Sequence, residues 1–227
     1  MSILLQSPTP DLQSSKNFYL RLGFRQATAN PLILTDGKVF IEINPDHYAR
    51  AGIKLFRESW KPEIQKLQEF TAVTAMENGY LLSDPSGVWI YLMEFVAPTE
   101  LVTDDKSFSV LGNFAGLSLE TTDIQKSKEL YEALGFTISG GSLDHGYISL
   151  ENHGFTISLM KPLSCPHLFF NPSMTYFNGA GNIKVIEKIR KLNIPIAEEI
   201  THFNNNRLVD NIIIRDPGGF GFFIFSD

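Results

Sequence analysis

DLQSSKNFYLRLGF, residues 11–24, returns without a gap as DIQKSKELYEALGF, residues 123–136, and eight of the fourteen positions are identical. Each copy begins with an Asp, which can accept hydrogen bonds from the free backbone N–H groups at the start of a helix. Apolar residues follow at helical spacing, and each copy ends near a Gly, which enters the left-handed conformation at low cost. The stretch therefore predicts a short helix that is used twice, and the repeat indicates a duplicated chain.

Short strands are predicted around the first copy of this helix. A strand at residues 2–7 precedes it, and extended segments at 31–36 and 39–44 follow. A second unit begins near residue 53 with another strand and continues with a helix over 61–70. Its last strands are separated by the sequence DPSG, which suits a tight turn.

The second half of the chain repeats this plan and ends with a similar turn, DPGG at 216–219. Its last helix is predicted over 182–192, with Ile183, Ile186 and Ile189 facing inward. We therefore expect an α+β fold of four tandem βαβββ units, which form curled antiparallel sheets with outer helices.

The repeat also predicts how the chain divides into domains. Residues 1–97 and 112–227 would each form a domain of two units. The segment 98–111 is rich in Pro, Thr, Asp and Ser, lacks hydrophobic periodicity and is the expected linker.

Composition excludes several classes of partner. The 19 basic and 25 acidic residues give a net charge of −6 without long runs of either sign, which argues against nucleic acid and anionic membranes as partners. Cys165 is the only cysteine, so no internal disulfide can form. The N-terminus does not have the pattern of a signal peptide, and no apolar stretch is long enough to span a bilayer. We expect a cytoplasmic protein.

The helix that ends in Leu-Gly-Phe, together with the Asp-Pro-x-Gly turn before the last strand of each half, resembles the vicinal oxygen chelate superfamily. This superfamily includes glyoxalase I, extradiol dioxygenases and bleomycin resistance proteins, and the resemblance covers both halves of the chain. It implies that each sheet forms a trough for a ligand. Because many relatives pair two such subunits, a chain with both halves fused is expected to be monomeric.

The resemblance also implies where a divalent metal would be bound. Its ligands would be two His and one Glu in each half, at defined distances from the helix and the turn. Those six positions hold residues that are not typical ligands, namely Leu4, Gly52, Tyr91, Gly116, Pro172 and Phe223. We therefore predict no metal and no cofactor. The alternative is a non-standard set formed by His167, Glu42 and Glu120, although His167 also fits an ordinary loop residue.

Strand alternation predicts which residues line the troughs, because every second side chain points to the same face. The predicted ligand-binding residues are Glu42, Lys54, Phe56, Trp89 and Tyr91 in the first half and Ser118, Glu120, Tyr176 and Phe223 in the second. Lys54 is positioned to pair with Glu42. Glu42 and Glu120 are also the weak candidates for a catalytic role, since an enclosed carboxylate is costly unless it is paired.

Three functional hypotheses follow from these residues. The leading one is a metal-independent binding protein, rather than an enzyme, that holds a small aromatic or cationic molecule in an aromatic trough. The second is a metal-dependent lyase or dioxygenase with a non-standard ligand set. The third is a protein-interaction module in which aromatic side chains fill the troughs.

Overall fold

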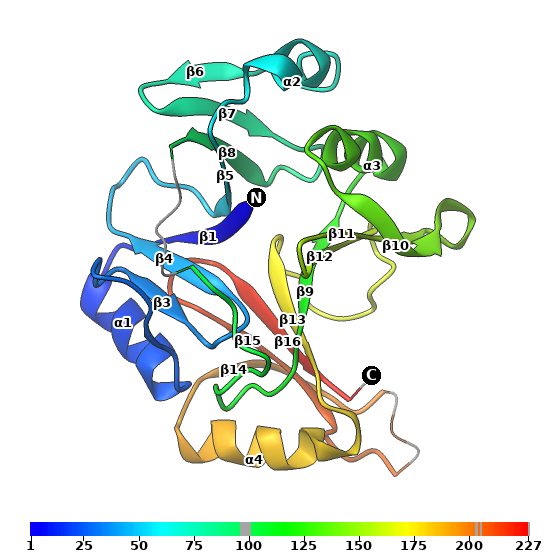
Figure 1. Ribbon diagram of the computed structural model, residues 1–227. Helices are drawn as coiled ribbons and strands as arrows, with labels where there is room; N and C mark the ends of the chain where they lie inside the picture. Colours follow the sequence, from blue (N-terminus) through cyan, green and yellow to red (C-terminus); the bar gives the residue numbers. More distant parts are fainter. Residues whose placement is uncertain (96–100, 203, 205, 227) are drawn as a thin grey trace.

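The computed structural model describes residues 1–95, 101–202, 204 and 206–226. In these residues the chain forms two eight-stranded sheets and four α-helices (Figure 1). The elements of the first half are β1 (Ser2–Pro8), α1 (Leu12–Arg21), β2 (Arg25–Gln26), β3 (Ile33–Thr35), β4 (Phe40–Asn44), β5 (Gly52–Arg57), α2 (Lys61–Leu67), β6 (Thr74–Met76), β7 (Gly79–Ser83) and β8 (Trp89–Glu94).

The second half repeats the same order of elements and adds two short 3₁₀ helices. Its elements are β9 (Phe114–Glu120), α3 (Ile124–Ala133), β10 (Thr137–Ser142), η1 (Leu143–His145), β11 (Tyr147–Asn152), β12 (Phe155–Met160), β13 (Ser173–Phe177), η2 (Gly179–Gly181), α4 (Asn182–Lys191), β14 (Ile196–Ile200), β15 (Asn211–Arg215) and β16 (Gly221–Phe225).

The strand order shows that the two units of each half share one sheet. The first sheet runs β2-β3-β4-β1-β5-β8-β7-β6, and the second runs β10-β11-β12-β9-β13-β16-β15-β14. The units join where β1 pairs with β5 and β9 with β13, both antiparallel. Within each unit the first strand pairs with the last in parallel, so the sheets are mixed. The predicted α+β fold of four βαβββ units is confirmed.

The duplicated helices begin and end as their sequences predict. Asp11 accepts hydrogen bonds from the backbone N–H groups of Gln13 and Ser14, and Asp123 accepts one from Lys126. Gly23 and Gly135 follow the helices with φ values of 91° and 95°, a conformation that favours glycine. The same local chemistry therefore produces both helices.

Two details of the other helices differ from the prediction. Helix α2 ends at Leu67, three residues before the predicted Phe70. In α4 the side chains of Ile186 and Ile189 are buried as expected, but Ile183 is 44% exposed. Ile183 lies in the first turn of α4, and helical periodicity alone does not show how far the sheet extends beneath that turn.

The two halves share one contiguous hydrophobic core. Phe18 of α1 packs against Phe222 of β16, with ring centroids 5.7 Å apart. Helices α2 and α3 contact each other at one end of the molecule, and α1 and α4 lie at the other end (Figure 1). Each half thus packs its duplicated helix against the second unit of the other half.

The predicted linker is only partly within the described residues. Residues 98–100 lie outside them, and residues 101–111 form no helix or strand. The segment packs against the first half: Val110 N–H donates to Leu22 O over 2.9 Å, and Phe108 N–H donates to Asp36 O over 2.8 Å. In the described part of the chain, no helix has the length and apolar character needed to cross a bilayer.

Candidate functional site

The strand register fixes which side chains share a face of the first sheet. Leu4 pairs with Lys54, and Lys54 pairs with Tyr91, so these three residues form one row across β1, β5 and β8. Gln6 is two residues from Leu4 and points to the same face, in a row with Gly52 and Trp89. We call this face the first trough.

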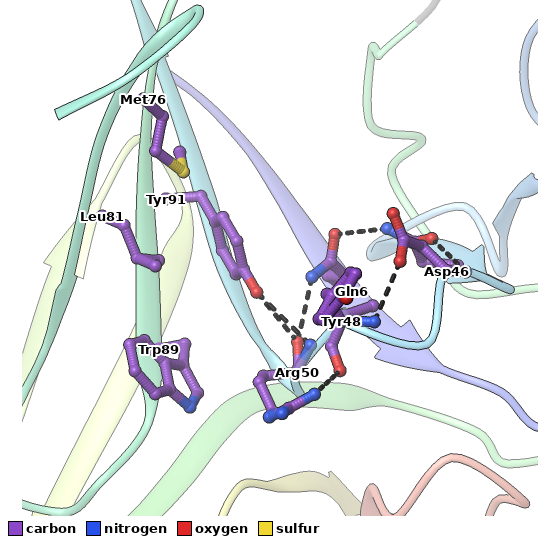
Figure 2. Close-up of a pocket in the computed structure, with 10 residues that line it drawn as sticks. Gln6, Asp46, Tyr48, Arg50, Met76, Leu81, Trp89 and Tyr91 are labelled. Carbon is purple, nitrogen blue, oxygen red and sulfur yellow. Dashed lines mark hydrogen bonds between the residues drawn. The ribbon is translucent and has the colours of Figure 1, made fainter. Parts of the chain in front are cut away.

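A cavity of about 380 Å³ opens at one end of the first trough (Figure 2). Trp89 and Tyr91 of β8 provide its aromatic side, and Met76 and Leu81 extend the apolar surface. The polar side comes from β1, β4 and the loop that joins β4 to β5. The residues on that side are Gln6, Asn44, Asp46, Tyr48, Ala49 and Arg50. An apolar cavity with a few convergent polar groups is typical of a site for a small organic molecule.

A hydrogen-bond network holds the polar side in place. The side chain of Gln6, only 2% exposed, donates from Nε2 to Arg50 O over 3.0 Å and accepts from Asn44 Nδ2 over 3.0 Å. The Tyr91 hydroxyl oxygen accepts from the Arg50 backbone N–H over 3.3 Å. Gln6 and Tyr91 thus hold the backbone of Arg50 at the edge of the cavity.

Tyr91 is neutral at physiological pH in this site. Burial raises the pKa of its hydroxyl, because the phenolate would lose solvation, and the hydrogen bond to Arg50 partly opposes this rise. The neutral hydroxyl keeps its proton and donates it to Arg50 O over 3.5 Å.

Glu42 and Lys54 pair with each other on the floor of the first trough, as the sequence predicts. Their side chains are only 17% and 13% exposed, and the Lys54 ammonium lies 5.8 Å from the centre of the Tyr91 ring. A buried carboxylate needs such a partner. The pair has no net charge, so Glu42 does not present a free carboxylate to a ligand.

The other end of the first trough is filled by its own side chains. Leu4, Ile33, Phe40 and Phe56 form a separate hydrophobic cluster there. Phe56 also meets Phe95 edge to face at 5.3 Å. Of the ligand-binding residues predicted for this half, Trp89 and Tyr91 therefore line the cavity, whereas Phe56 packs away from it.

The floor of the second trough is rich in hydroxyl groups, and these groups form hydrogen bonds with each other. Ser118 and Thr175 share a hydrogen bond of 2.7 Å across β9 and β13. On the neighbouring strands, Ser149 bonds Ser158 at 2.9 Å and Tyr147 at 2.8 Å. Ser118, a predicted ligand-binding residue, thus already has a partner within the protein.

The loop between β12 and β13 covers part of the second trough. Phe169 packs edge to face on Phe223, with ring centroids 5.0 Å apart, and Phe225 stacks on the same ring. Glu120 accepts a hydrogen bond from Leu163 N–H over 3.2 Å. Phe223 and Glu120, both predicted to bind a ligand, therefore contact residues of the chain itself.

Tyr176 lies on the opposite face from the one predicted. It is fully buried on the helix side of the second sheet, and its hydroxyl donates to Asp36 over 3.0 Å. The prediction took Pro172 as the counterpart of Gly52, but Ser173 is the residue that pairs with Ser118, as Gly52 pairs with Gln6. A shift of one residue reverses the face of every side chain in a strand.

The positions at which relatives would hold a metal do not fit that role in this chain. With the corrected register they are Leu4, Gly52, Tyr91, Gly116, Ser173 and Phe223. A Cβ atom at Gly52 would lie 2.3 Å from Trp89 O, and one at Gly116 would lie 2.5 Å from Thr156 O. Neither site has room for a histidine in the observed backbone.

The non-standard ligand set is not assembled either. Glu42 belongs to the first sheet, whereas Glu120 belongs to the second, and His167 pairs with Glu198 at 3.2 Å. Among the residues that the structure describes, no three His, Cys, Asp or Glu side chains come together as a metal site.

Arg50 and Asn44 are site residues that sequence reasoning missed. Asn44 ends β4, and Arg50 lies in the following loop, where strand alternation no longer assigns a face. The Pro45-Asp46 pair after the strand marks a turn, but it does not show that the turn folds back over the trough.

Comparisons with known proteins support the fold. No protein-family model matches the sequence, and no curated protein matches it. Among solved structures, the 2,3-dioxygenase LapB from Pseudomonas sp. KL28 matches with a TM-score of 0.54 and 16% identity, over 96% of this chain and 90% of that chain. Homoprotocatechuate 2,3-dioxygenase from Arthrobacter globiformis matches with a TM-score of 0.54 and 14% identity, over 98% of this chain and 78% of that chain.

A third solved structure has the same fold, and the three together bear on the cofactor prediction. The 2,2',3-trihydroxybiphenyl 1,2-dioxygenase from Sphingomonas wittichii strain RW1 has a TM-score of 0.53 and 12% identity, over 100% of this chain and 91% of that chain. These matches show the fold that the resemblance implies. The prediction that no cofactor is involved is wrong in view of these neighbours, because dioxygenases of this kind typically use iron.

Proposed function

Starting from a chain with the vicinal oxygen chelate fold, we propose that the protein binds a small, flat organic molecule in the cavity of the first trough. One observation supports this proposal: in one open cavity, Trp89 and Tyr91 face polar residues that hydrogen bonds hold in place. Flat aromatic side chains supply contact area at low entropic cost, and the polar wall orients the ligand.

The first trough supports this function better than the second. Its cavity is already formed, whereas in the second trough Phe169 covers Phe223 and the hydroxyl groups of Ser118 and Thr175 bond each other. A ligand in the second trough would first have to displace these contacts. One binding site per chain is therefore expected.

A thermal-shift screen tests this proposal. One-ring and two-ring aromatic compounds should raise the melting temperature, since binding to the folded state alone stabilises it. Trp89→Ala should abolish the shift. Tyr147→Ala is the matched control, because Tyr147 is a half-exposed aromatic residue of the second sheet. Equal shifts in wild type and Trp89→Ala would contradict binding at this cavity.

The solved neighbours favour a second candidate, a metal-dependent dioxygenase or lyase with a non-standard ligand set. Elemental analysis after loading with ferrous, manganous or zinc ions tests it. This candidate expects stoichiometric metal in the wild type. Because Glu42 and Glu120 lie on different sheets, a clear loss in Glu42→Gln or in Glu120→Gln would show which acid is involved. Metal content that stays below stoichiometry in every loaded sample would contradict it.

A further inference from the structure

The charges around the cavity of the first trough differ from those expected for a cationic ligand. Glu42, the acid of this trough, is already paired with Lys54. Asp46 is a lining residue, but its side chain is 61% exposed, and its Oδ1 accepts a hydrogen bond from Tyr48 N–H over 2.9 Å. Among the residues that line the cavity, Arg50 supplies the cationic group, its guanidinium.

The guanidinium of Arg50 has unused hydrogen-bond donors. Its Nη1 donates to Ala49 O over 2.9 Å and to His47 O over 3.3 Å. Within the described residues, Nε and Nη2 make no hydrogen bond, and no carboxylate lies within salt-bridge distance of the side chain. The two carbonyls hold the guanidinium in place and leave part of its planar donor edge available.

Arg50 is placed to act together with the aromatic side of the cavity. It lies two residues before Gly52, which pairs with Trp89. Its backbone is fixed by Gln6 and Tyr91, as described above. In Figure 2 the Arg50 side chain extends toward the Trp89 end of the pocket, and Asp46 lies at the opposite end, beyond Gln6.

We propose that the ligand is an aromatic carboxylate, with its ring against Trp89 and Tyr91 and its carboxylate on the guanidinium of Arg50. This inference rests on the proposed function, because it names the class of molecule that the same cavity binds. Hydrogen bonds between a guanidinium and a carboxylate are stronger than neutral ones and fix the orientation of both planar groups. The Tyr91 hydroxyl lies beside the same loop, where it accepts from the Arg50 N–H and donates to Arg50 O.

Three probes with the same ring system and different charge test the proposal by isothermal titration calorimetry. They are 2-naphthoate, the neutral 2-naphthamide and the cationic 2-naphthylmethylamine. We expect 2-naphthoate to bind on the order of tenfold more tightly than the amide, and the amine most weakly. The preference for the carboxylate should decrease as salt is added, since Arg50 is exposed to solvent.

Variants of two arginines separate the role of Arg50 from that of net charge. Arg50→Gln should remove the preference for 2-naphthoate over 2-naphthamide and leave binding of the amide nearly unchanged. Arg25→Gln is the matched control, because it removes the same charge at a residue that packs on Phe108, away from the cavity. Arg25→Gln should keep the wild-type preference.

The other possible results separate the carboxylate assignment from the binding function. Equal affinities for the three probes, or tighter binding of the amine, would overturn the carboxylate assignment and leave the proposed binding function intact. A preference that persists in Arg50→Gln would also overturn the assignment. Failure of all three probes to bind would contradict both the assignment and the binding of flat aromatic molecules in this cavity.

Discussion

The Tyr19 hydroxyl of α1 donates to Asp216 Oδ2 over 2.6 Å and so joins the helix of the first half to the last turn of the second half. The reciprocal contact also exists: the Tyr131 hydroxyl of α3 donates to Asp84 Oδ2 over 3.0 Å. Tyr19 and Tyr131 occupy the same position in the duplicated helix, and Asp84 and Asp216 begin the two Asp-Pro-x-Gly turns. The two repeated motifs therefore bind each other across the halves.

Removal of either tyrosine hydroxyl should destabilise the protein. All four residues of these contacts are buried, and a hydrogen bond to a carboxylate contributes about 1.5–3 kcal/mol. Tyr19→Phe and Tyr131→Phe should each lower the free energy of unfolding by about that amount in urea denaturation. Tyr48→Phe, at a tyrosine that is 75% exposed, should change it little. An unchanged value in Tyr19→Phe would show that the contact contributes nothing.

The two turn carboxylates predict a dependence of stability on pH. Burial raises the pKa of Asp84 and Asp216 above the ordinary value, although hydrogen bonds from Ser86 and Ser7, among others, oppose the rise. A raised pKa means that the folded state holds the proton more tightly than the unfolded state. The resulting stabilisation is complete below the ordinary pKa and is lost as the pH rises through the raised value.

Asp216→Asn removes this titration from one turn. As the pH rises from about 4 toward 7, the wild type should lose stability relative to Asp216→Asn, because only the wild type must bury a charge there. Urea denaturation of both proteins across this range measures the difference. A difference that does not change with pH would contradict the raised pKa.

Alkaline titration should separate two groups among the seven tyrosines. Burial, together with the nearby aspartates, raises the pKa of Tyr19, Tyr131 and Tyr176 well above 10. In ultraviolet absorbance these three, all fully buried, should ionise only as the protein unfolds. Ionisation of all seven before the loss of circular dichroism would contradict their placement.

Gly116 stands where the resemblance implies a metal ligand, and its backbone predicts that a side chain is not tolerated there. Its φ is 136°, and a Cβ would lie 2.5 Å from Thr156 O, so Gly116→Ala should destabilise the protein by more than about 1 kcal/mol. Gly140→Ala is the control, because nothing lies within 4 Å of its Cβ position. Equal stability of the two variants would show that the backbone adapts and that a larger side chain is tolerated at Gly116.

Local sequence patterns predicted the elements of this fold because local chemistry determines them. Asp11 and Gly23 delimit a helix wherever the chain places it, and alternation along β8 put Trp89 and Tyr91 on one face. The pattern failed in β13, where an error of one residue placed Tyr176 in the trough. Alternation could not place Arg50, because the residues of a loop do not alternate between two faces. The sequence pattern also could not predict the contact of Tyr19 with Asp216, because that contact depends on how the two halves pack.

A flat molecule should bind against Trp89, and fluorine NMR can detect it there. The chain has two tryptophans, so protein labelled with 5-fluorotryptophan should give two resonances, and Trp89→Phe assigns them. Trp60 is fully buried, whereas Trp89 lines the cavity. Saturating 2-naphthoate should shift the Trp89 resonance through the ring current of the ligand and leave that of Trp60 in place. An unchanged Trp89 resonance, or a shift of Trp60 alone, would show that 2-naphthoate does not bind against Trp89.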